Sequence, residues 1–494
     1  MNIYKSISLE LCTGLISNTR KTPAAKIINY THLVWGRTAA RHRRHLHSTM
    51  ASDAPLLKTT VLPVDATKLG SLTSRPSQND ILDELDIKLD PNSPDAQHLR
   101  SAAEQLRTSD IPVAFPTETV YGLGADATRS SATKGIYKAK QRPADNPLIV
   151  HFASLEQLRN LLRSPTDAPD TDPIPPIYKP LITKFWPGPL TLILPNPPHS
   201  PLAPEVTAGL STFGARMPRH PLALALIREA AVPIAAPSAN ASTKPSPTAA
   251  EHVAYDLDGR IETILDGGPC DVGVESTVVD GLSSPPLILR PGGISLEQLR
   301  ECEGWERTEV GYRDVSEKGV APRAPGMKYR HYAPKATVVL FESGRRAPGW
   351  GDLVGSLREG GKVGVVRTRR WVVDGNGEEG PVKLVEGKAV ARANGVEKVA
   401  KGFEGMLQAV HKQHVQRSVE THEVANGDEK FTLLDIDLGG DTADIARGVF
   451  AALRDMDRLE VDAIFVEGIG EEEGDVAAAV MNRLRKAAEV KVAA

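Results

Sequence analysis

A short basic segment has the side-chain chemistry of a phosphate site. Residues 137–147, YKAKQRPADNP, place Lys138, Lys140 and Arg142 where a predicted helix ends before a proline. The chain has no GxxxxGK[ST] motif, and GIGEEEG at 468–474 lacks the GxGxxG spacing, so a phosphate site must be built from side chains. On spacing alone, compensation of the helix dipole by cations is the simpler alternative.

Two further polar segments directly follow predicted strands. PTETVYGLG at 116–124 combines hydroxyls, a carboxylate and glycines, and strand-end loops of α/β sheets are where ligands bind. APSANASTKPSPT at 236–248 offers small hydroxyl and amide groups that can hydrogen-bond a ribose or a phosphate without steric bulk. A plain strand-to-helix turn and a turn-rich loop are equally good explanations of the two segments taken singly.

The elements that must position these segments alternate between strand and helix. Short apolar runs predict strands at 112–116, 148–150, 190–194, 213–217, 232–236 and 261–265. Apolar residues at helical spacing predict helices at 95–107, 129–140, 154–163, 220–230 and 248–255. This alternation predicts an α/β domain over 95–300, with residues 164–176 as a surface insertion because they have no apolar periodicity.

A second domain is predicted after a linker. Residues 301–335 include VAPRAPGMKYRHYAPK, which is too rich in proline, glycine and charge to pack as a regular element. Beyond it, strands are predicted at 338–341, 363–366, 433–436 and 464–466, and amphipathic helices at 399–410 and 445–456. This pattern predicts a parallel-sheet α/β domain over 336–494.

The N-terminus differs from the rest of the chain. Residues 1–49 are rich in Lys, Arg, Ser and Thr, and Glu10 is their only acid, which is typical of a mitochondrial presequence; disorder is the alternative. Met50 opens a second start. Residues 50–94 are polar and weakly periodic, so an extended lead-in is expected. We therefore expect a cytoplasmic protein with a mitochondrial form made from the Met1 start.

Composition excludes several classes of protein. The 494 residues carry a net charge of −3, which argues against binding nucleic acid by bulk charge. No window approaches the ~20 apolar residues of a membrane-spanning helix, so no membrane contact is expected. Three scattered cysteines, Cys12, Cys270 and Cys302, form no CxxC pair for zinc or redox chemistry. The histidines of HKQH at 411–414 lack a third ligand nearby, which favours a solvated helix face over a metal site.

The polar segments, taken in chain order, resemble a known family. FPTETVYGLG, KQRPADNPLIVH, FWPGPLT, ARMPRHP, APSANASTKPSPT, ESTVVD and LRPG are similar to the YrdC-like catalytic domain of threonylcarbamoyl-AMP synthases over about 95–300. The family's KxR and SxN pairing is present as Lys140 and Arg142 with Ser238 and Asn240, and YRHYAP lies at 329–334. The chain thus resembles the two-domain form, which implies a twisted mixed-sheet catalytic domain followed by a Rossmann-like parallel α/β domain.

The resemblance implies a nucleotidyltransferase. L-threonine, bicarbonate and ATP would give L-threonylcarbamoyl-AMP, pyrophosphate and water. The adenylate would feed a threonylcarbamoyl transferase complex that modifies adenosine 37 of ANN-decoding tRNAs, and an RNA contact by this chain is a further expectation. Mg²⁺ is expected with ATP, but the sequence names no protein ligand for it.

The resemblance also implies roles for individual residues. Threonine contacts carry over to Thr117, His151, Arg216, Ala236 and Ser276. ATP contacts carry over to Lys140, Asn146, Thr212, Ser238, Asn240, Ser246, Arg290 and Tyr332, with Lys140 and Arg142 as catalytic residues. Fixed cations suit the negative charge that builds up in such a reaction. The Arg216 fork suits the carboxylate of threonine, although an ion pair with a surface acid is an alternative.

The same sequence features suggest two rival functions, and the resemblance assigns a structural role to the linker. A double-stranded RNA or tRNA-binding module without catalysis would use the same basic residues for phosphate contacts. The related hydrogenase-maturation carbamoyltransferases carry a zinc finger, which three scattered cysteines cannot build. Pyrophosphate release that depends on ATP and threonine would separate enzyme from binder. The resemblance further implies that the linker, with Tyr329, His331 and Tyr332, folds over the cavity as a lid.

Overall fold

The computed structural model describes most of both predicted domains. The described residues are 57–76, 82–164, 168, 171–312, 332–357, 361–374, 383–386, 418–426 and 429–493. The predicted presequence, Tyr329, His331, the helix at 399–410 and the histidines of 411–414 lie outside them. Within the described ranges, no helix is long and apolar enough to cross a membrane.

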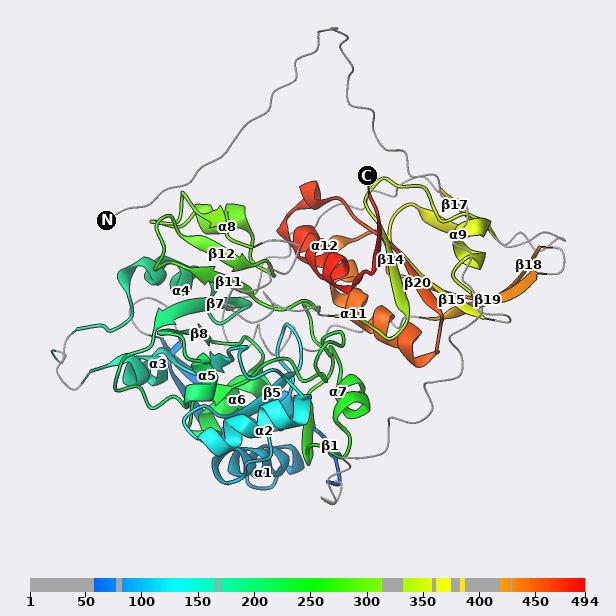
Figure 1. Cartoon of the computed structure of the whole chain (residues 1–494). Helices are drawn as coiled ribbons and strands as arrows, with labels where there is room; N and C mark the ends of the chain where they lie inside the picture. Colours follow the sequence, from blue (N-terminus) through cyan, green and yellow to red (C-terminus); the bar gives the residue numbers. More distant parts are fainter. Residues whose placement is uncertain are drawn as a thin grey trace, which may run out of the picture. The chain divides into compact units, whose positions relative to one another are not determined.

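The first domain is built on a mixed sheet, in which the described residues form eleven strands (Figure 1). The strands, in sheet order, are β1 (Thr60–Pro63), β10 (Thr263–Asp266), β4 (Val113–Phe115), β5 (Gly122–Asp126), β9 (Ile234–Ala235), β6 (Ile149–His151), β8 (Thr212–Arg216), β7 (Leu190–Pro195), β11 (Thr277–Asp280), β12 (Leu287–Arg290) and β13 (Glu309–Val310). β6 pairs parallel with β8 and antiparallel with β9. The mixed-sheet α/β fold expected for this part of the chain is therefore confirmed.

The five helices predicted for this domain are all present in its described part, together with three short helices that were not predicted. They are α1 (Pro94–Thr108), α2 (Ser130–Lys140), α3 (Leu155–Leu162), α4 (Lys179–Phe185), α5 (Pro204–Thr207), α6 (Pro221–Ala230), α7 (Ala250–Leu257) and α8 (Leu296–Arg300), with 3-10 turns η1 (Ala66–Lys68) and η2 (Pro176–Tyr178). Helix α1 begins where the Ser93 side chain accepts a hydrogen bond from the Ala96 amide, at 3.3 Å. Its buried residues recur every three or four positions, as the sequence predicted.

Two segments outside 95–300 belong to this domain. The expected lead-in supplies β1, which pairs with β10, and a hairpin of β2 (Gly70–Pro76) and β3 (Leu82–Leu89). The lead-in was predicted only as extended, and its strands were not singled out, because β1 is a mostly exposed edge strand and carries little apolar signal. At the other end, Trp305 is fully buried and donates its indole N–H to the Ile177 carbonyl at 2.7 Å, so the predicted linker begins later than 301.

The second domain carries a six-stranded sheet in the order β18 (Glu420–Asn426), β19 (Glu429–Asp437), β15 (Lys362–Arg367), β20 (Ala463–Glu467), β14 (Thr337–Phe341), β21 (Val490–Val492). Its other described elements are β16 (Trp371–Asp374), β17 (Lys383–Glu386), α9 (Trp350–Val354), α11 (Thr442–Arg458), η3 (Glu471–Glu473) and α12 (Asp475–Ala487). Only β18 pairs antiparallel among the described pairings of this sheet. The predicted parallel α/β domain is confirmed, with one antiparallel edge strand.

Candidate active site

A cavity in the first domain gathers most of the predicted site residues. It encloses about 1120 Å³ of empty space, its open mouth included. The predicted residues among its lining are Thr117, Lys140, Arg142, Asn146, His151, Arg216, Ala236, Ser238, Asn240, Ser246, Arg290 and Tyr332. They come from loops and strand ends that are far apart in the sequence, and the mixed sheet brings them together.

The strand register places the key side chains next to one another. His151 ends β6 and Arg216 ends β8, and the two are register partners in a parallel pair. β9 lies beside β6 and leads directly into Ala236. Because β6 and β8 run in the same direction, their carboxyl ends meet at one edge of the sheet, where ligands commonly bind.

Two predicted contacts are not among the residues that line this cavity. Thr212 begins β8 and lines a separate depression with Ile193 and Asp280. Four residue steps along the strand, about 13 Å, separate it from Arg216 at the other end. Ser276 is fully buried, and its hydroxyl and carbonyl oxygens accept hydrogen bonds from Arg290, at 3.0 Å and 2.9–3.0 Å. Ser276 therefore supports a cavity residue, and Thr212 lies at the opposite end of β8 from Arg216.

Lys140 anchors the loop that carries the SxN pair. It is the last residue of α2 and is 1% exposed. Its Nζ donates to the carbonyl oxygens of Ser238 and Asn240, the latter at 2.6 Å. The Ser238 hydroxyl in turn donates to Asn240 Oδ1 at 2.5 Å. Burial, together with the Arg142 charge, lowers the pKa of Lys140 well below its usual value. The KxR and SxN motifs are therefore joined directly by this one side chain.

Arg142 and Asn146 present polar atoms from the loop after α2. Arg142 Nη2 donates to the Pro147 carbonyl at 3.0 Å, which fixes the guanidinium against its own loop. The Asn146 side chain is 1% exposed, and its amide oxygen has no hydrogen-bond partner among the described residues. A buried acceptor without a partner is costly, so a ligand with a donor group would stabilise this position.

Arg216 pairs with a buried acid rather than the surface acid that the sequence left open. Its Nη2 lies 2.8 Å from Glu118 Oε1, and the two side chains are 5% and 1% exposed. Burial raises the pKa of Glu118, but the charges of Arg216 and Arg219 outweigh it and lower that pKa below its usual value. The Arg216 Nε is buried with no partner among the described residues. One donor of the guanidinium is therefore unpaired within the described part of the chain.

Two other cavity residues are a neutral histidine, His151, and a threonine, Thr117, whose hydroxyl forms hydrogen bonds within its own turn. Burial, and then the Arg216 charge, lowers the pKa of His151 to about 3, so this imidazole is neutral at physiological pH. The Thr117 hydroxyl donates to the Val120 carbonyl at 2.7 Å and accepts from the amides of that same turn. Thr117 therefore shapes the 117–120 turn beside the cavity.

Comparison with known proteins decides the family. Residues 105–292 match the family model described as "Telomere recombination", and residues 294–489 match "Threonylcarbamoyl-AMP synthase, C-terminal domain". A Schizosaccharomyces pombe protein named threonylcarbamoyl-AMP synthase is 47% identical, over 81% of this chain and 90% of its own. The chain belongs to the threonylcarbamoyl-AMP synthase family. A Bacillus subtilis protein of the same name is 43% identical, over 83% of this chain and 96% of its own.

A solved structure extends the similarity of this threonylcarbamoyl-AMP synthase family member to both domains. The crystal structure of Pyrococcus abyssi Sua5 complexed with L-threonine is 36% identical, with a TM-score of 0.61. The alignment covers 88% of this chain and 100% of that one. The family's two-domain form, inferred from motif order, is therefore confirmed.

The second domain of this family member reaches the cavity through Arg483, which the sequence reasoning did not single out, and packs against Tyr332 of the predicted linker, which it did. Arg483 on α12 donates from Nε to Glu275 Oε2 at 3.1 Å, and Glu275 lines the cavity. Tyr332 is 6% exposed and stacks on Phe450 of α11, with ring centroids 5.1 Å apart. Glu275 lies within the ESTVVD motif and could have been noticed there. No pattern in the sequence pointed to Arg483.

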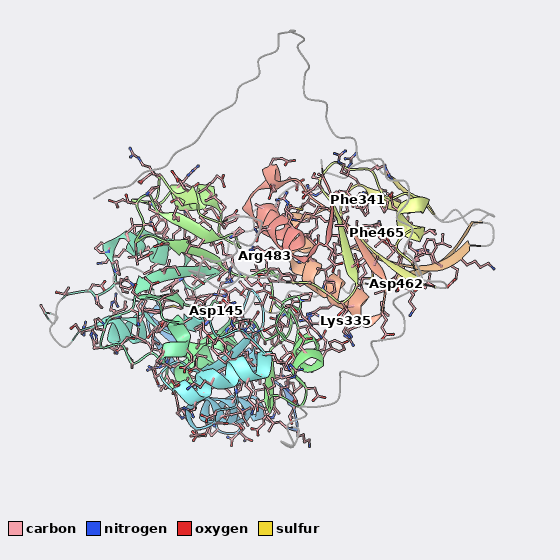
Figure 2. All side chains as sticks on the ribbon, viewed as in Figure 1. Asp145, Lys335, Phe341, Asp462, Phe465 and Arg483 are labelled. Atoms are coloured by element: carbon pink, nitrogen blue, oxygen red, sulfur yellow. The ribbon has the colours of Figure 1, made fainter. Side chains whose placement is uncertain are left out.

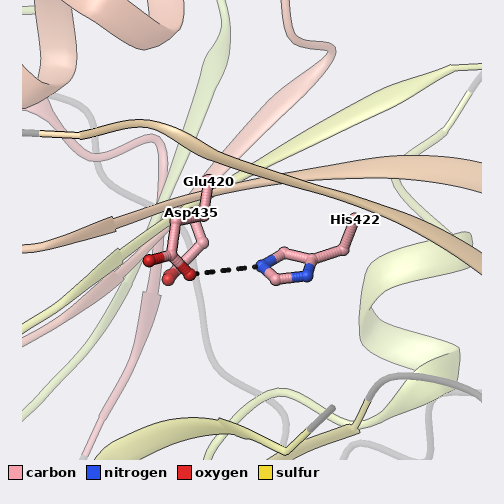
Figure 3. Close-up of side chains that lie close together, drawn as sticks. All are labelled: Glu420, His422 and Asp435. Atoms are coloured by element: carbon pink, nitrogen blue, oxygen red, sulfur yellow. Dashed lines mark ion pairs between the residues drawn. The ribbon is translucent and has the colours of Figure 1, made fainter. Parts of the chain in front are cut away.

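Three residues of the second domain are of types that bind metal ions, but they belong to an ion-pair network. Glu420, His422 and Asp435 each place one ligand atom within 4.8 Å of the others (Figure 3). His422 Nε2 lies 3.8 Å from Glu420 Oε2. Both oxygens of Asp435, however, accept hydrogen bonds from Arg367 at 2.7 Å. A guanidinium so close opposes a second cation, so an ion-pair network explains the group.

Proposed function

We propose that this chain is a threonylcarbamoyl-AMP synthase, which converts L-threonine, bicarbonate and ATP to L-threonylcarbamoyl-AMP, pyrophosphate and water. The observation that carries the proposal is the single cavity in which the KxR, SxN and Arg216 segments meet. Membership in the family supports the enzyme over the RNA-binding alternative.

The unpartnered donor of Arg216 supports a threonine subsite. A carboxylate accepts readily from a guanidinium fork, and the buried Nε lacks any other partner among the described residues. Glu118 holds the rest of the fork in place. His151, the register partner of Arg216, is neutral and adds no competing positive charge. Threonine bound here would place its amine inside the cavity, where bicarbonate can form the carbamate and release water.

ATP would occupy the part of the cavity lined by the Lys140 loop and Arg290. The carbamate oxygen would attack the α-phosphorus, and the bond to the leaving pyrophosphate would break. No side chain needs to act as nucleophile, so the contribution of the protein is positioning and fixed positive charge. Arg290 is buried, which lowers its pKa to about 10, and it therefore remains charged at neutral pH. Arg142 adds a further cationic side chain to the lining.

Mg²⁺ would enter with ATP and be held by its phosphates. Glu275 is the one carboxylate among the cavity-lining residues in the described part of the chain. One of its oxygens accepts from Ser246 and the other from Arg483, so neither is free for a metal. The residues present do not fit a dedicated magnesium site, and no step is assigned to a protein-bound ion.

The product would be consumed by a threonylcarbamoyl transferase complex that acts on adenosine 37 of ANN-decoding tRNAs. An RNA contact by this chain is not required for making the adenylate and is a separate prediction. The presequence before Met50 would direct one product to mitochondria and leave the shorter one in the cytoplasm.

Incubation of the purified chain with ATP, bicarbonate and L-threonine tests the function. We expect pyrophosphate and the threonylcarbamoyl adenylate in equal amounts, with neither formed when any one substrate is omitted. Replacement of threonine by alanine controls for unspecific ATP hydrolysis. Release of pyrophosphate that does not depend on threonine would contradict the proposal.

A further inference from the structure

One wall of the cavity is held by an ion pair from the second domain. Arg483 Nε lies 3.1 Å from Glu275 Oε2. Both residues are buried, with exposed fractions of 1% for Arg483 and 6% for Glu275. The two residues are 208 positions apart, and the boundary between the two matched family models falls between them. Figure 2 labels Arg483 among the side chains of α12. The ion pair therefore couples the second domain to the nucleotide cavity.

The partner of Glu275 on the cavity side is Ser246. The Ser246 hydroxyl lies 2.6 Å from Glu275 Oε1. Burial raises the pKa of Glu275, but Arg483 and then Arg290 outweigh it and lower the pKa to about 2, so the group is ionised. An ionised carboxylate only accepts, so Ser246 must donate to it. What Ser246 can offer the cavity is then an acceptor, which suits a ribose hydroxyl or the adenine amine and not a phosphate oxygen.

The charged and polar groups around Glu275 explain why this carboxyl group is ionised. Arg483, Arg290 and Tyr332 act on it, from α12, β12 and the segment before β14. The Tyr332 ring also lies under the Arg483 guanidinium, 6.0 Å from centroid to Cζ. Burial, and then the charge of Glu275, raises the pKa of Tyr332 to about 12, so the phenol is neutral. Glu275 is the negative centre to which the two arginines respond.

Helix α11 of the second domain also contacts the two loops that carry Glu275 and Ser246. Gly273 has φ +79°, and a Cβ there would lie 2.4 Å from Arg447 Cα in α11. Arg447 Nε donates to the Asp271 carbonyl at 2.9 Å. Near Ser246, Arg454 of α11 donates to Asp256 Oδ2 at 2.8 Å and to the Pro245 carbonyl. The Glu275 loop and the Ser246 loop therefore both rest on α11.

We propose that Arg483 is a positioning residue for ATP. By fixing Glu275 through their ion pair, it orients the Ser246 hydroxyl as an acceptor for the nucleoside part of ATP. The second domain is thus a part of the ATP site. This inference rests on the proposed function, but it concerns ATP binding, which is measured apart from turnover.

Calorimetric titration of the full-length chain with a non-hydrolysable ATP analogue tests the inference. Arg483→Gln should raise the Kd for the analogue about tenfold, because a mispositioned hydrogen bond in a buried site costs about that much. The affinity for L-threonine alone should not change. Arg483→Lys keeps the charge and should recover part of the loss. Arg485→Gln is the matched control, because Arg485 lies on the same helix but pairs with Glu342 and Glu471 of the second domain.

Two further measurements separate positioning from general stability. Glu275→Gln should weaken analogue binding as Arg483→Gln does, and the double variant should be no worse than either single variant. Loss of Arg483 should raise the pKa of Glu275, so analogue binding by Arg483→Gln should weaken as pH falls from about 8 to about 6, while the wild type changes less.

Specific outcomes would overturn the inference. One is an unchanged Kd for the analogue in an Arg483→Gln variant whose midpoint of thermal unfolding equals that of the wild type. The other is a double variant in which the losses of analogue affinity caused by Arg483→Gln and Glu275→Gln add up. Should Arg483→Gln fail to fold, Arg483→Lys and Ser246→Ala carry the test, and an unchanged Kd in both refutes it. A wild-type chain that binds the analogue but releases no pyrophosphate would sink the proposed function and leave this inference standing.

Discussion

The Arg216–Glu118 pair allows stability and substrate binding to be perturbed separately. Arg216→Met removes a guanidinium that donates to Glu118 Oε1 at 2.8 Å and to Thr119 Oγ1 at 2.9 Å. Glu118, which is 1% exposed, then keeps the Arg219 amide, 3.1 Å from its second oxygen, and the Arg219 charge. The variant therefore leaves a buried carboxylate that has lost its direct ion-pair partner.

The expected cost of this single change is large. Breaking a buried pair by removing one partner costs about 3–5 kcal/mol, because the remaining charge stays desolvated. Without Arg216, the burial that raises the pKa of Glu118 is opposed mainly by the Arg219 charge, so we expect this pKa to rise. In the wild type, the lowered pKa of Glu118 contributes stability above the unfolded pKa and loses it as pH falls. In Arg216→Met the sign reverses, so its deficit should shrink as pH falls and Glu118 takes up a proton.

The double variant Glu118→Gln/Arg216→Met removes the stranded charge as well. A neutral amide of nearly the same shape should restore most of the lost stability, measured as the midpoint of thermal unfolding. Threonine binding should not return, because the guanidinium that would hold the substrate carboxylate is still missing. We expect the Kd for L-threonine, measured by calorimetry, to rise at least about a hundredfold in both variants, equivalent to roughly 3 kcal/mol.

Either of two results would refute this reasoning. Recovery of threonine affinity in the double variant would mean that Arg216 serves only to neutralise Glu118. Native stability in Arg216→Met would mean that the two side chains do not form a buried pair. Glu118→Gln alone is the control, since it keeps Arg216 and should retain measurable threonine binding.

Three other predictions follow from the site and the N-terminus. Lys140→Met keeps the bulk of the side chain but leaves the carbonyls of Ser238 and Asn240 without their donor. Turnover in the pyrophosphate assay should therefore fall at least about a hundredfold. Turnover at the parent rate would show that the SxN loop does not need this anchor. Tyr332→Ala removes the stacking on Phe450 and should speed release or hydrolysis of the adenylate in single-turnover experiments, and an unchanged product lifetime would show that Tyr332 does not cover the site. Separately tagged Met1 and Met50 products should localise to mitochondria and cytosol, and two identical cytosolic distributions would rule out a presequence.

The sequence predicted most of the fold because apolar periodicity is a local property. The amphipathic pattern of 95–107 and the apolar run of 464–466 correspond to α1 and β20. Edge strand β1 was missed, since a strand that is mostly exposed has little apolar signal. PTETVYGLG was read as a loop, although its glycines begin β5, because a fully buried strand of Gly, Leu and Ala lacks the alternation that marks a half-buried one.

By itself, the sequence supplied the motif segments, and the family resemblance that they carry implied twelve side chains that line one cavity. Tertiary structure decided which charges pair. Lys140 holds a loop about 100 residues away, Arg216 meets Glu118, and Arg483 reaches Glu275 from the other domain. It also turned Ser276 into a support for Arg290 and left Thr212 at the far end of β8. Ion pairs and hydrogen bonds depend on distances of a few ångströms between elements, and sequence spacing does not encode those distances.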